Sequence, residues 1–399
     1  MKAIVFIGSS TSGSSAEAFS AAAQLGYAAI LLTDRKTFLR VKEKFPEIAD
    51  IVFMESMDEE SVRKEIDRLA AFHHIQAIIS FVDPYVSLAA KLSNAFCNSA
   101  LSVDALSIMG DKLLTRNALR NHPATCEFEV IDQNHNKPVI NYPFILKSPI
   151  SNGSKDVYFI ENEKEFDIAL CKMNKRLPQP SWIAEEFIEG PQYMIEIVVV
   201  ETIPIIVAII QQEIIKDYTF IVTAYEVVMQ MDEMIYRELW QTIHSIVEEI
   251  GLQHGACHLE VRYSSKGWKL IEMNPRIAGG AMNRMITEAF GINLVKETIK
   301  LYLGEEPDLL RKNSRYVYTS FITLNNFGYL VDIEGIDVAY SVPGIIDIAV
   351  KPKIGSIVMP PISMGQRYGY TMAVGETSEM AKERAESSAR LIKFYLEPI

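Results

Sequence analysis

The sequence predicts an α/β protein in three parts, and three observations support this prediction. Residues 1–105 alternate short apolar strands with helices, a pattern typical of a parallel sheet with helices on both faces. Residues 106–310 carry most of the polar motifs, and residues 311–399 are β-rich with frequent glycine and proline. The length of 399 residues also exceeds what one hydrophobic core normally serves, so two to three domains are expected.

In the first part we expect strands at residues 3–7, 27–32, 51–54 and 77–81, and helices at residues 16–25 and 59–72. Ligands of such sheets bind at the carboxyl ends of the strands, and two of these ends are conspicuous, residues 8–15 and 81–85. Residues 8–15 resemble a phosphate-cradling turn, but they lack the third glycine of a dinucleotide fingerprint and the Lys-Ser/Thr pair of a P-loop. A loop that shapes a substrate pocket, or a plain helix N-terminus, is therefore the favoured interpretation.

Composition and charge argue against several classes of protein. The net charge of −12 argues against a nucleic-acid partner, whose affinity comes mainly from Lys and Arg. No apolar run approaches the roughly 20 residues of a membrane-spanning helix. Residues 195–210 are interrupted by Glu196, Glu201 and Pro204, so we expect two buried strands there. The N-terminus predicts a strand and not a signal peptide, and the four cysteines lack metal-ligand spacing, as expected of reduced thiols in a cytoplasmic protein.

A β-hairpin is predicted over residues 258–276, with its turn at residues 264–267. Because side chains alternate across a strand, polar residues share one face on each strand: His258, Glu260 and Arg262, then Glu272, Asn274 and Arg276. The alternate positions are apolar and are expected in the core: Leu259, Val261, Ile271 and Met273.

The predicted register of this hairpin places two carboxylates face to face. If the hairpin is symmetric about Lys266, Glu260 lies opposite Glu272, which destabilises a sheet unless a positive charge lies between them. Two carboxylates and an amide oxygen suit a hard cation such as Mg²⁺, and Arg276 on the same face would hold an anion. A solvated polar face is the alternative that these residues alone leave open.

Other segments point to a phosphate-bearing ligand. Asp111 and Lys112 open a predicted helix, and Lys147 lies in a buried apolar strand, where a lysine is costly unless it meets an anion. Residues 151–155 form a small loop whose backbone N–H groups suit phosphate oxygens. The strand at residues 182–188 passes into a segment that suits an adenine ring, because such a hinge supplies an apolar slot and backbone hydrogen bonds.

In their order along the chain, these motifs resemble those of the ATP-grasp family. The matching pieces are Asp111-Lys112, Leu146-Lys147-Ser-Pro with Ser151-Asn-Gly-Ser, Glu185-Glu-Phe-Ile-Glu-Gly, Glu196, His258-Leu-Glu260, and Ile271-Glu-Met-Asn-Pro-Arg276 with Gly279-Gly280. Each motif alone has little specificity, whereas six in order have much. The resemblance covers essentially the whole chain. It implies an N-terminal Rossmann-like preATP-grasp domain (1–105), an ATP-grasp core (106–310, with a lid at about 125–190) and a C-terminal β-rich extension that completes the core (311–399).

The resemblance implies a nucleotide site made of Lys112, Lys147, Ser151, Gly153, Ser154, Glu185, Glu186, Phe187, Ile188 and Gln192. Lys112 and Lys147 match the lysines that hold the phosphates, although a solvated helix lysine is the alternative for Lys112. Glu185 would accept the exocyclic amine of adenine through its side chain or a neighbouring carbonyl. Gln192 stands where many members carry a ribose-binding glutamate, which puts that contact in doubt.

The resemblance also implies the metal ligands and the catalytic residues. Glu260, Glu272 and Asn274 match the ligands of Mg²⁺, with Mn²⁺ as a substitute. The implied catalytic residues are Arg276, Lys147 and His258. Arg276 matches the arginine that stabilises the carboxyl substrate and the transferring phosphoryl group, and a structural histidine is the alternative for His258.

Within the family, the chain looks most like the L-amino acid ligases that make dipeptides from two amino acids and ATP. The signals are the segment N-P-R-I-A-G-G and the extension at residues 335–398. The substrate-binding residues so implied are Arg276, Gly279, Gly280, His258, Asp83, Pro84 and Glu196. Gly279 and Gly280 carry no side chain, which predicts room for a larger first amino acid. Asp83 and Pro84 would form a second wall, or a turn without substrate contact. The oligomeric state stays open, with a homodimer common among relatives.

Two alternatives are weaker. A carboxylase or purine-pathway ligase would need a biotin or aminoimidazole ribotide site, and nothing in the sequence specifies one. A non-catalytic nucleotide-binding protein would show loss of a metal carboxylate or a lysine, yet every such position is filled. We therefore expect an ATP-dependent ligase.

Overall fold

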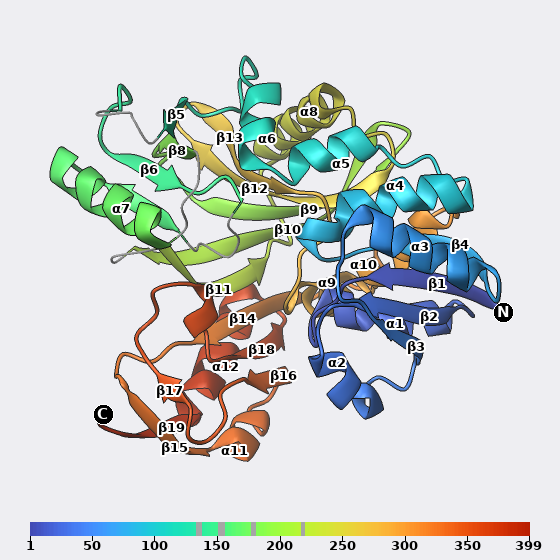
Figure 1. Cartoon of the computed structure of the whole chain (residues 1–399). Coiled ribbons are helices and arrows are strands. Elements are labelled where there is room, and N and C mark those ends of the chain that lie inside the picture. The colour runs from blue at the N-terminus through green and yellow to red at the C-terminus, as the bar shows by residue number, and fades with distance from the viewer. Residues whose placement is uncertain (133–137, 151–155, 177–180, 217–219) are drawn as a thin grey trace.

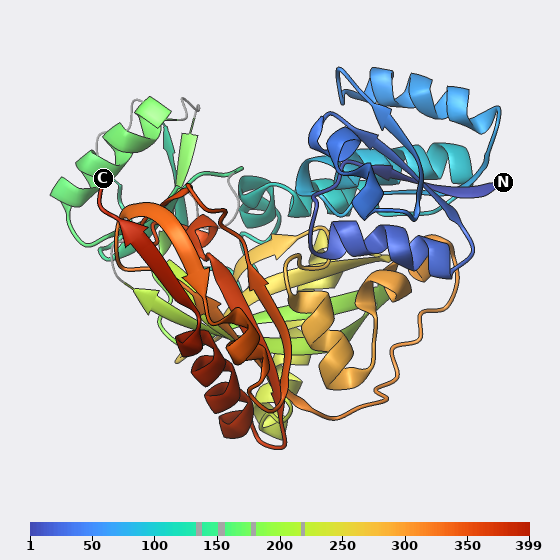
Figure 2. The ribbon, with the colours of Figure 1, turned by 90° about the horizontal axis from the view of Figure 1, so that it is seen from below.

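The computed structural model describes residues 1–132, 138–150, 156–176, 181–216 and 220–399. Its elements have the expected α/β character, and the two termini lie on opposite sides of the molecule (Figures 1 and 2). The first sheet contains β1 (Lys2–Ile7), β2 (Ala28–Thr33), β3 (Ile48–Phe53) and β4 (His74–Ile79). All its pairs are parallel and the strand order is β3-β2-β1-β4, which confirms the predicted parallel sheet.

Helices cover both faces of this first sheet because β1 is apolar at every buried position. Ile4 and Phe6 pack in one hydrophobic cluster with Phe19 of α1 (Ser14–Gln24). Val5 and Ile7 face the other way and pack in a second cluster with residues of α3 (Glu59–Ala70) and α4 (Val86–Cys97). A short helix, α2, spans Thr37–Arg40.

The largest sheet has eight strands in the order β13-β12-β9-β10-β11-β14-β18-β16. Along the chain these are β9 (Gln192–Val200), β10 (Ile203–Lys216), β11 (Phe220–Val227), β12 (Gly255–Ser264), β13 (Gly267–Asn274), β14 (Tyr316–Ile322), β16 (Ile345–Val350) and β18 (Gly369–Gly375). The strands β9 and β10 confirm the two buried strands predicted at residues 195–210. Because β14 pairs with β11, the C-terminal strands extend the same sheet as the predicted core.

Each face of this sheet is covered by helices. One face packs against α5 (Val103–Met109) and α8 (Glu233–Ile250). The other face packs against α9 (Met282–Phe290) and α10 (Leu294–Tyr302) in the cluster that also holds Phe19 of α1. This shared cluster ties the first sheet to the largest one.

Two smaller sheets complete the fold. One has the order β5-β8-β6-β7, from β5 (Phe128–Asp132), β6 (Phe144–Lys147), β7 (Val157–Ile160) and β8 (Ser181–Glu186), with α7 (Glu163–Arg176) packed on it. The other has the order β17-β15-β19, from β15 (Gly328–Glu334), β17 (Ile357–Val358) and β19 (Lys393–Glu397). The remaining helices are α6 (Lys112–Ala118), α11 (Ile336–Tyr340) and α12 (Ser378–Leu391).

The sequence predicts a closing helix at residues 378–395, capped by Thr377 or Ser378, and this prediction is wrong at the end of the helix. Thr377 caps α12 as expected, since its side chain accepts a hydrogen bond from the Met380 N–H. The helix stops at Leu391, because Ile392 is extended and Lys393–Glu397 forms β19 against β15. No helix among the described residues is long and apolar enough to cross a membrane.

Candidate active site

A cavity of about 580 Å³ opens beside the largest sheet, and residues from all parts of the chain line it. Its volume suits a ligand pocket, for which roughly 300–1,000 Å³ is usual. Most of the predicted site residues line it: Asp83, Lys112, Lys147, Glu185, Glu186, Phe187, Ile188, Gln192, His258, Glu260, Glu272, Asn274, Arg276, Gly279 and Gly280. Ser151, Gly153 and Ser154 lie outside the described residues. Pro84 and Glu196 are not among the lining residues.

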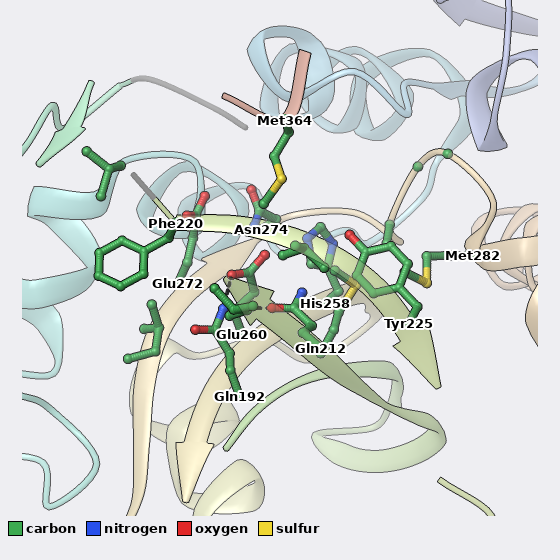
Figure 3. A pocket seen from close by; sticks show the side chains of 18 of the residues that line it. Gln192, Gln212, Phe220, Tyr225, His258, Glu260, Glu272, Asn274, Met282 and Met364 are labelled. Atoms are coloured by element: carbon green, nitrogen blue, oxygen red, sulfur yellow. Dashed lines mark hydrogen bonds between the residues drawn. The ribbon is translucent and has the colours of Figure 1, made fainter. Parts of the chain in front are cut away.

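The hairpin of β12 and β13 forms one side of the cavity. Its register places Glu260 opposite Glu272 and His258 opposite Asn274, which confirms the predicted pairing. Figure 3 shows Glu260, Glu272 and Asn274 together at the cavity. A β-bulge follows, because Val261 pairs with Leu270 and leaves Ile271 as the extra residue.

This bulge corrects the prediction that Ile271 belongs to the core. Its side chain is half-buried and lines the cavity, since the extra residue breaks the strict alternation of faces. Its carbonyl oxygen accepts hydrogen bonds from Arg116 at 2.9 Å and from Lys147 at 3.3 Å. The bulge therefore anchors two cations beside the two carboxylates.

The carboxylate pair fits a divalent cation. Burial and the neighbouring Glu272 raise the pKa of Glu260 to about 7, although Lys112 and Lys147 act in the opposite direction. Lys112 Nζ lies 3.3 Å from Glu272 Oε1. The pKa of Glu260 is raised despite the lysines, so they offset only part of the negative charge of Glu260 and Glu272. The described residues hold no group of three or more His, Cys, Asp or Glu suited to a metal. The fitting donor set is thus two carboxylates and the Asn274 amide, as expected for Mg²⁺ that also takes phosphate and water oxygens.

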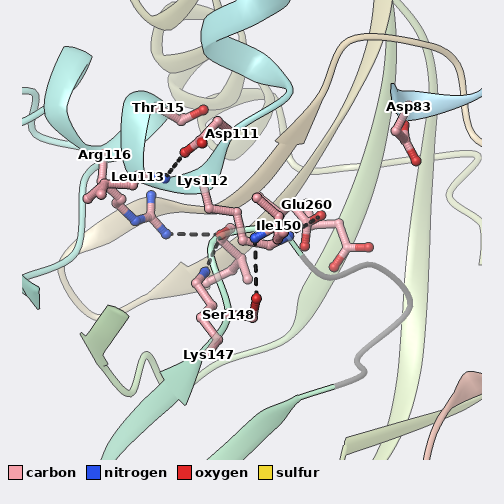
Figure 4. Close-up of polar contacts among 12 residues, drawn as sticks. Asp83, Asp111, Lys112, Leu113, Thr115, Arg116, Lys147, Ser148, Ile150 and Glu260 are labelled. Atoms are coloured by element: carbon pink, nitrogen blue, oxygen red, sulfur yellow. Dashed lines mark hydrogen bonds and ion pairs between the residues drawn. The ribbon is translucent and has the colours of Figure 1, made fainter. Parts of the chain in front are cut away.

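Three charged residues form a buried network beside the hairpin. Glu185, which is 4% exposed, receives hydrogen bonds from Arg116 at 2.7 and 3.1 Å and lies 2.7 Å from Lys147 Nζ. Burial alone would raise the pKa of Glu185, but the charges of Arg116 and Lys147 outweigh it and lower that pKa to about 2. Figure 4 shows Arg116 and Lys147 pointing toward one another, with Lys112 nearby. Both oxygens of Glu185 are thus engaged by Arg116 and Lys147, so of the two contacts to adenine predicted from the sequence, the one through a neighbouring carbonyl would be the accessible one.

Sequence reasoning missed Arg116, which is 2% exposed. One signal was available: Arg116 follows Lys112 by four residues in α6, and such a spacing puts two side chains on the same helix face. The Asp111 carboxylate caps this short helix by accepting from Leu113 and Leu114 N–H, which fixes where both cations point.

Gln192 is held at both ends of its amide. Its Nε2 donates to Gln212 at 2.7 Å and to Glu260 at 3.0 Å, while its Oε1 accepts from Arg262 Nε at 2.9 Å. The guanidinium of Arg262 in turn lies over the ring of Phe187, 5.3 Å from its centroid. A hydroxyl bound by Gln192 would have to compete with one of these partners.

Arg276 and Asp83 are far apart in the sequence but lie in contact at the cavity. Arg276 lies 2.7 Å from Asp83 Oδ2, and its NH1 donates to the Ile277 carbonyl at 3.0 Å. Asp83 thus helps to hold the Arg276 side chain at the cavity, and Asp83 itself lines the cavity. Pro84, in the same turn, does not reach the lining.

His258 is a neutral ring at the cavity. Burial, with a further contribution from the Arg276 charge, lowers its pKa to about 4. Its Nδ1 lies 2.9 Å from the Arg276 carbonyl, which only accepts, so Nδ1 carries the proton and Nε2 is left as an acceptor. The ring therefore both supports the Arg276 backbone and presents an acceptor.

Glu196 supports the cavity from below its surface. The residue is fully buried, and its Oε1 accepts a hydrogen bond from the Ala278 N–H at 3.0 Å. Its Oε2 has no hydrogen-bond partner among the described residues, and burial raises its pKa to about 8. Glu196 thus positions the segment at residues 277–280 and lies outside the cavity lining.

Replacing Glu196 by glutamine is expected to stabilise the protein at pH 8. The folded pKa of about 8 lies above the ordinary 4.5, so the unfolded chain releases a proton that the folded chain keeps, and stability falls as pH rises from about 4.5 to 8. Glutamine keeps the acceptor for Ala278 without this cost, which is on the order of 4 kcal/mol at pH 8. Urea unfolding at pH 5 and pH 8 measures the effect, with Glu201→Gln in the adjoining turn as control. Parallel pH profiles for Glu196→Gln and the wild type would contradict the prediction.

The loop at residues 8–15 helps to shape the cavity, which is one of the two interpretations that the sequence favours. Ser12 and Gly13 line the cavity, and Ser14 Oγ donates to the Ala278 carbonyl at 2.6 Å. Gly13 has φ +72°, and a Cβ there would lie 2.6 Å from the Gly280 nitrogen. Glycine is therefore required where this loop meets the Gly279-Gly280 segment.

Comparison with known proteins gives three matches along the chain. An ATP-grasp domain matches residues 140–284, and an ATP-grasp N-terminal domain matches residues 19–96. The chain belongs to the ATP-grasp family. A third model, the L-amino acid ligase C-terminal domain 2, matches residues 320–397.

Two curated relatives of this ATP-grasp protein are distant. An uncharacterized protein, y4rH, of Sinorhizobium fredii is 26% identical over 263 residues, 65% of this chain and 54% of that protein. The L-arginine-specific L-amino acid ligase of Bacillus subtilis is 20% identical over 279 residues, 66% of this chain and 64% of that protein. The chain thus matches less than two thirds of the length of either relative.

Solved structures share the whole fold. The L-amino acid ligase from Bacillus licheniformis has a TM-score of 0.85 at 18% identity, covering 100% of this chain and 99% of that one. Phosphoribosylglycinamide synthetase from Anaerococcus prevotii has a TM-score of 0.73 at 16% identity, covering 100% of both chains. The biotin carboxylase domain of Hydrogenobacter thermophilus 2-oxoglutarate carboxylase, in complex with MgADP, has a TM-score of 0.68 at 16% identity, covering 98% of this chain and 90% of that one. At such identities the likeness shows the ATP-grasp fold alone.

Proposed function

We propose that this ATP-grasp protein is an L-amino acid ligase, which joins two amino acids into a dipeptide and releases ADP and phosphate. The observation that carries the proposal is the position of its C-terminal segment. Residues 320–397, which match the L-amino acid ligase C-terminal domain, contribute a wall of the cavity through Phe321, Ala349, Lys351, Met364, Arg367 and Tyr370. The part of the chain that is typical of these ligases therefore faces the place where substrates would bind.

The cavity offers the groups that phosphoryl transfer needs, which are mainly positioning and neutralisation of charge. Lys112 and Lys147 would bind the phosphates of ATP, with Glu260, Glu272 and Asn274 as ligands of Mg²⁺. Bound Mg²⁺ supplies positive charge at the phosphates. Aromatic rings of Phe187 and Phe220, stacked with centroids 6.0 Å apart, give an apolar region suited to adenine.

The acid and the amine would meet beside Arg276. The carboxylate of the first amino acid attacks the γ-phosphorus and the bond to the ADP oxygen breaks, which gives an acyl phosphate. The neutral amine of the second amino acid then attacks the acyl carbon, loses a proton, and phosphate leaves with the C–O bond electrons. The Arg276 guanidinium would stabilise charge on the carboxyl and phosphoryl oxygens in both steps, and His258 Nε2 is an acceptor at the same wall.

A screen of amino-acid pairs for phosphate release with ATP and Mg²⁺, followed by mass detection of the product, tests the proposal. We expect release that requires two amino acids and a product with the mass of a dipeptide. ATP turnover that ignores amino acids would contradict it. Turnover stimulated by bicarbonate would favour the carboxylase and purine-pathway alternatives, whose structures share the fold.

Filling the cavity at Gly279 is expected to narrow the choice of the first amino acid. A Cβ at Gly279 meets no atom within 4 Å and its φ is not left-handed, whereas Gly280 has φ +66° and would be strained by substitution. In Gly279→Phe, kcat/KM for a bulky first amino acid should fall about 10-fold relative to kcat/KM for alanine as the first amino acid. The reason is that a filled pocket rejects the larger side chain of the substrate. Gly279→Ala is the matched control with a smaller expected change. Unchanged selectivity in Gly279→Phe would show that residue 279 does not border the first substrate.

A further inference from the structure

Arg367 stands out on the C-terminal wall of the cavity. Its guanidinium lies over the Phe321 ring at 3.9 Å from the centroid and near the Tyr225 ring at 5.6 Å, and NH1 donates to the Tyr225 hydroxyl at 3.3 Å. Phe321 and Tyr225 pack edge to face, with centroids 4.9 Å apart. The aromatic rings hold the arginine in place without neutralising its charge.

Arg367 also lacks a carboxylate partner among the described residues, unlike several other cations that line the cavity. Three of them are paired: Lys112 with Glu272, Lys147 with Glu185, and Arg276 with Asp83. Among the described residues, no carboxylate lies within ion-pair distance of Arg367, and its buried Nε has no hydrogen-bond partner. An unpartnered buried donor on a cation is costly, and a bound anion would remove that cost.

Lys351 adds a second positive charge to the same wall. It lines the cavity on the segment after β16, and within the described ranges it makes no side-chain hydrogen bond or ion pair. Burial lowers the pKa of Lys351, and the positive charge of Arg367 makes a second, smaller contribution in the same direction. Two like charges that repel each other across one wall favour an anion between them.

The proposed reaction leaves one anion in need of a partner. The carboxylate of the first amino acid is converted to the acyl phosphate, where Arg276 and the metal ligands lie. The carboxylate of the second amino acid is not consumed and stays charged inside the cavity, where an unpaired charge is unfavourable. A planar guanidinium matches a carboxylate with two parallel hydrogen bonds.

We infer that Arg367, assisted by Lys351, binds the free carboxylate of the amine-donating amino acid and so selects substrates with an unblocked C-terminus. This inference rests on the proposed function and assigns its second subsite. Phe321 and Tyr225 hold the guanidinium in position for that contact, so the subsite is built by the segment that follows residue 320 together with β11.

The experiment compares amino acids with their carboxamides as amine donors, in the wild type and in Arg367→Gln, Arg367→Lys and Lys351→Gln. We expect the wild type to prefer the free carboxylate, and Arg367→Gln to raise the KM for that donor about 10- to 100-fold, as expected for loss of a charged hydrogen-bonded contact. The KM for the carboxamide and for ATP should hardly change, so the preference disappears. Arg367→Lys should recover part of it, and Lys351→Gln should show a smaller rise.

Arg311→Gln is the matched control, because Arg311 also stacks on a phenylalanine, Phe290 at 4.0 Å, but does not line the cavity. Should Arg367→Gln fail to fold in thermal unfolding, Lys351→Gln and Arg367→Lys still carry the test. An unchanged preference for the free carboxylate in all three cavity variants would overturn the inference. The inference would also be overturned if the Arg367 variants changed the KM only for acidic first amino acids, measured by comparing aspartate with asparagine. Arg367 would then contact the side chain of the first substrate and not the carboxylate of the second. A wild type that releases phosphate with no amino-acid pair would instead refute the proposed function, and the subsite with it.

Discussion

Replacing Glu272 by alanine is expected to lower ATP-dependent turnover by at least about 10²- to 10³-fold, the usual effect of removing a group that stabilises charge in the transition state. Glu272 lies opposite Glu260 in the hairpin and 3.3 Å from Lys112. Its loss removes one of the two carboxylates that fit a divalent cation and also removes the ion pair between Glu272 and Lys112. Phosphate release with ATP, Mg²⁺ and an amino-acid pair measures the effect.

Arg276→Ala should have an effect of the same order through a different contact, because it removes the cation paired with Asp83 at the cavity. Glu248→Ala, at the exposed end of α8, is the control and should retain activity. Raising Mg²⁺ should restore little activity to Arg276→Ala but part of it to Glu272→Ala. Near-native activity in both cavity variants would contradict the assignment of the site.

The hairpin shows how far alternation along a strand predicts a site. The period of two, together with a short turn, was sufficient to place Glu260 opposite Glu272 and His258 opposite Asn274. The alternation could not predict the bulge at Ile271, because the inserted residue is apolar and stands next to apolar Leu270, so the sequence does not show which of the two is the extra one. Yet the carbonyl oxygen of this bulged residue accepts the hydrogen bonds from Arg116 and Lys147.

The fold was predictable where neighbours in sequence are neighbours in space. The first sheet follows from its strand–helix alternation, and the two strands at residues 195–210 from interruptions in one apolar run. The continuation of the largest sheet from β11 to β14 joins segments separated by almost a hundred residues, which no local pattern specifies. For the same reason the C-terminal wall, with Arg367 and Lys351, became visible only in three dimensions.

The charges around the cavity explain both what was predicted and what was missed. Lys147 was identified because a lysine in an apolar strand needs an anion, and the structure supplies one in Glu185, 2.7 Å away. The second cation on that carboxylate, Arg116, comes from a helix with no unusual sequence. The contact also has a structural role, since Glu185 of β8 joins Lys147 of β6 to Arg116 of α6.

Replacing Glu185 by glutamine is expected to destabilise the protein by about 3–5 kcal/mol, because it leaves Arg116 and Lys147 buried without their counter-charge. The pH dependence has a defined sign. The folded pKa of about 2 lies below the ordinary 4.5, so the stabilisation from Glu185 is fully present above about pH 4.5 and is lost as pH falls through about 2. The shift corresponds to about 3 kcal/mol at neutral pH.

Urea unfolding of Glu185→Gln and the wild type at pH 7 and pH 3 measures this difference, which should shrink at the lower pH. Glu186→Gln is the matched control, because Glu186 is the next residue of β8 but pairs at 2.9 Å with the exposed Lys266. Its expected cost is below about 1 kcal/mol, since exposed ion pairs contribute little. Equal stability loss in the two variants would contradict a buried charge network at Glu185. A large loss in Glu185→Gln alone would mean that Glu185 holds Lys147 and Arg116 in place beside the hairpin that carries Glu260 and Glu272.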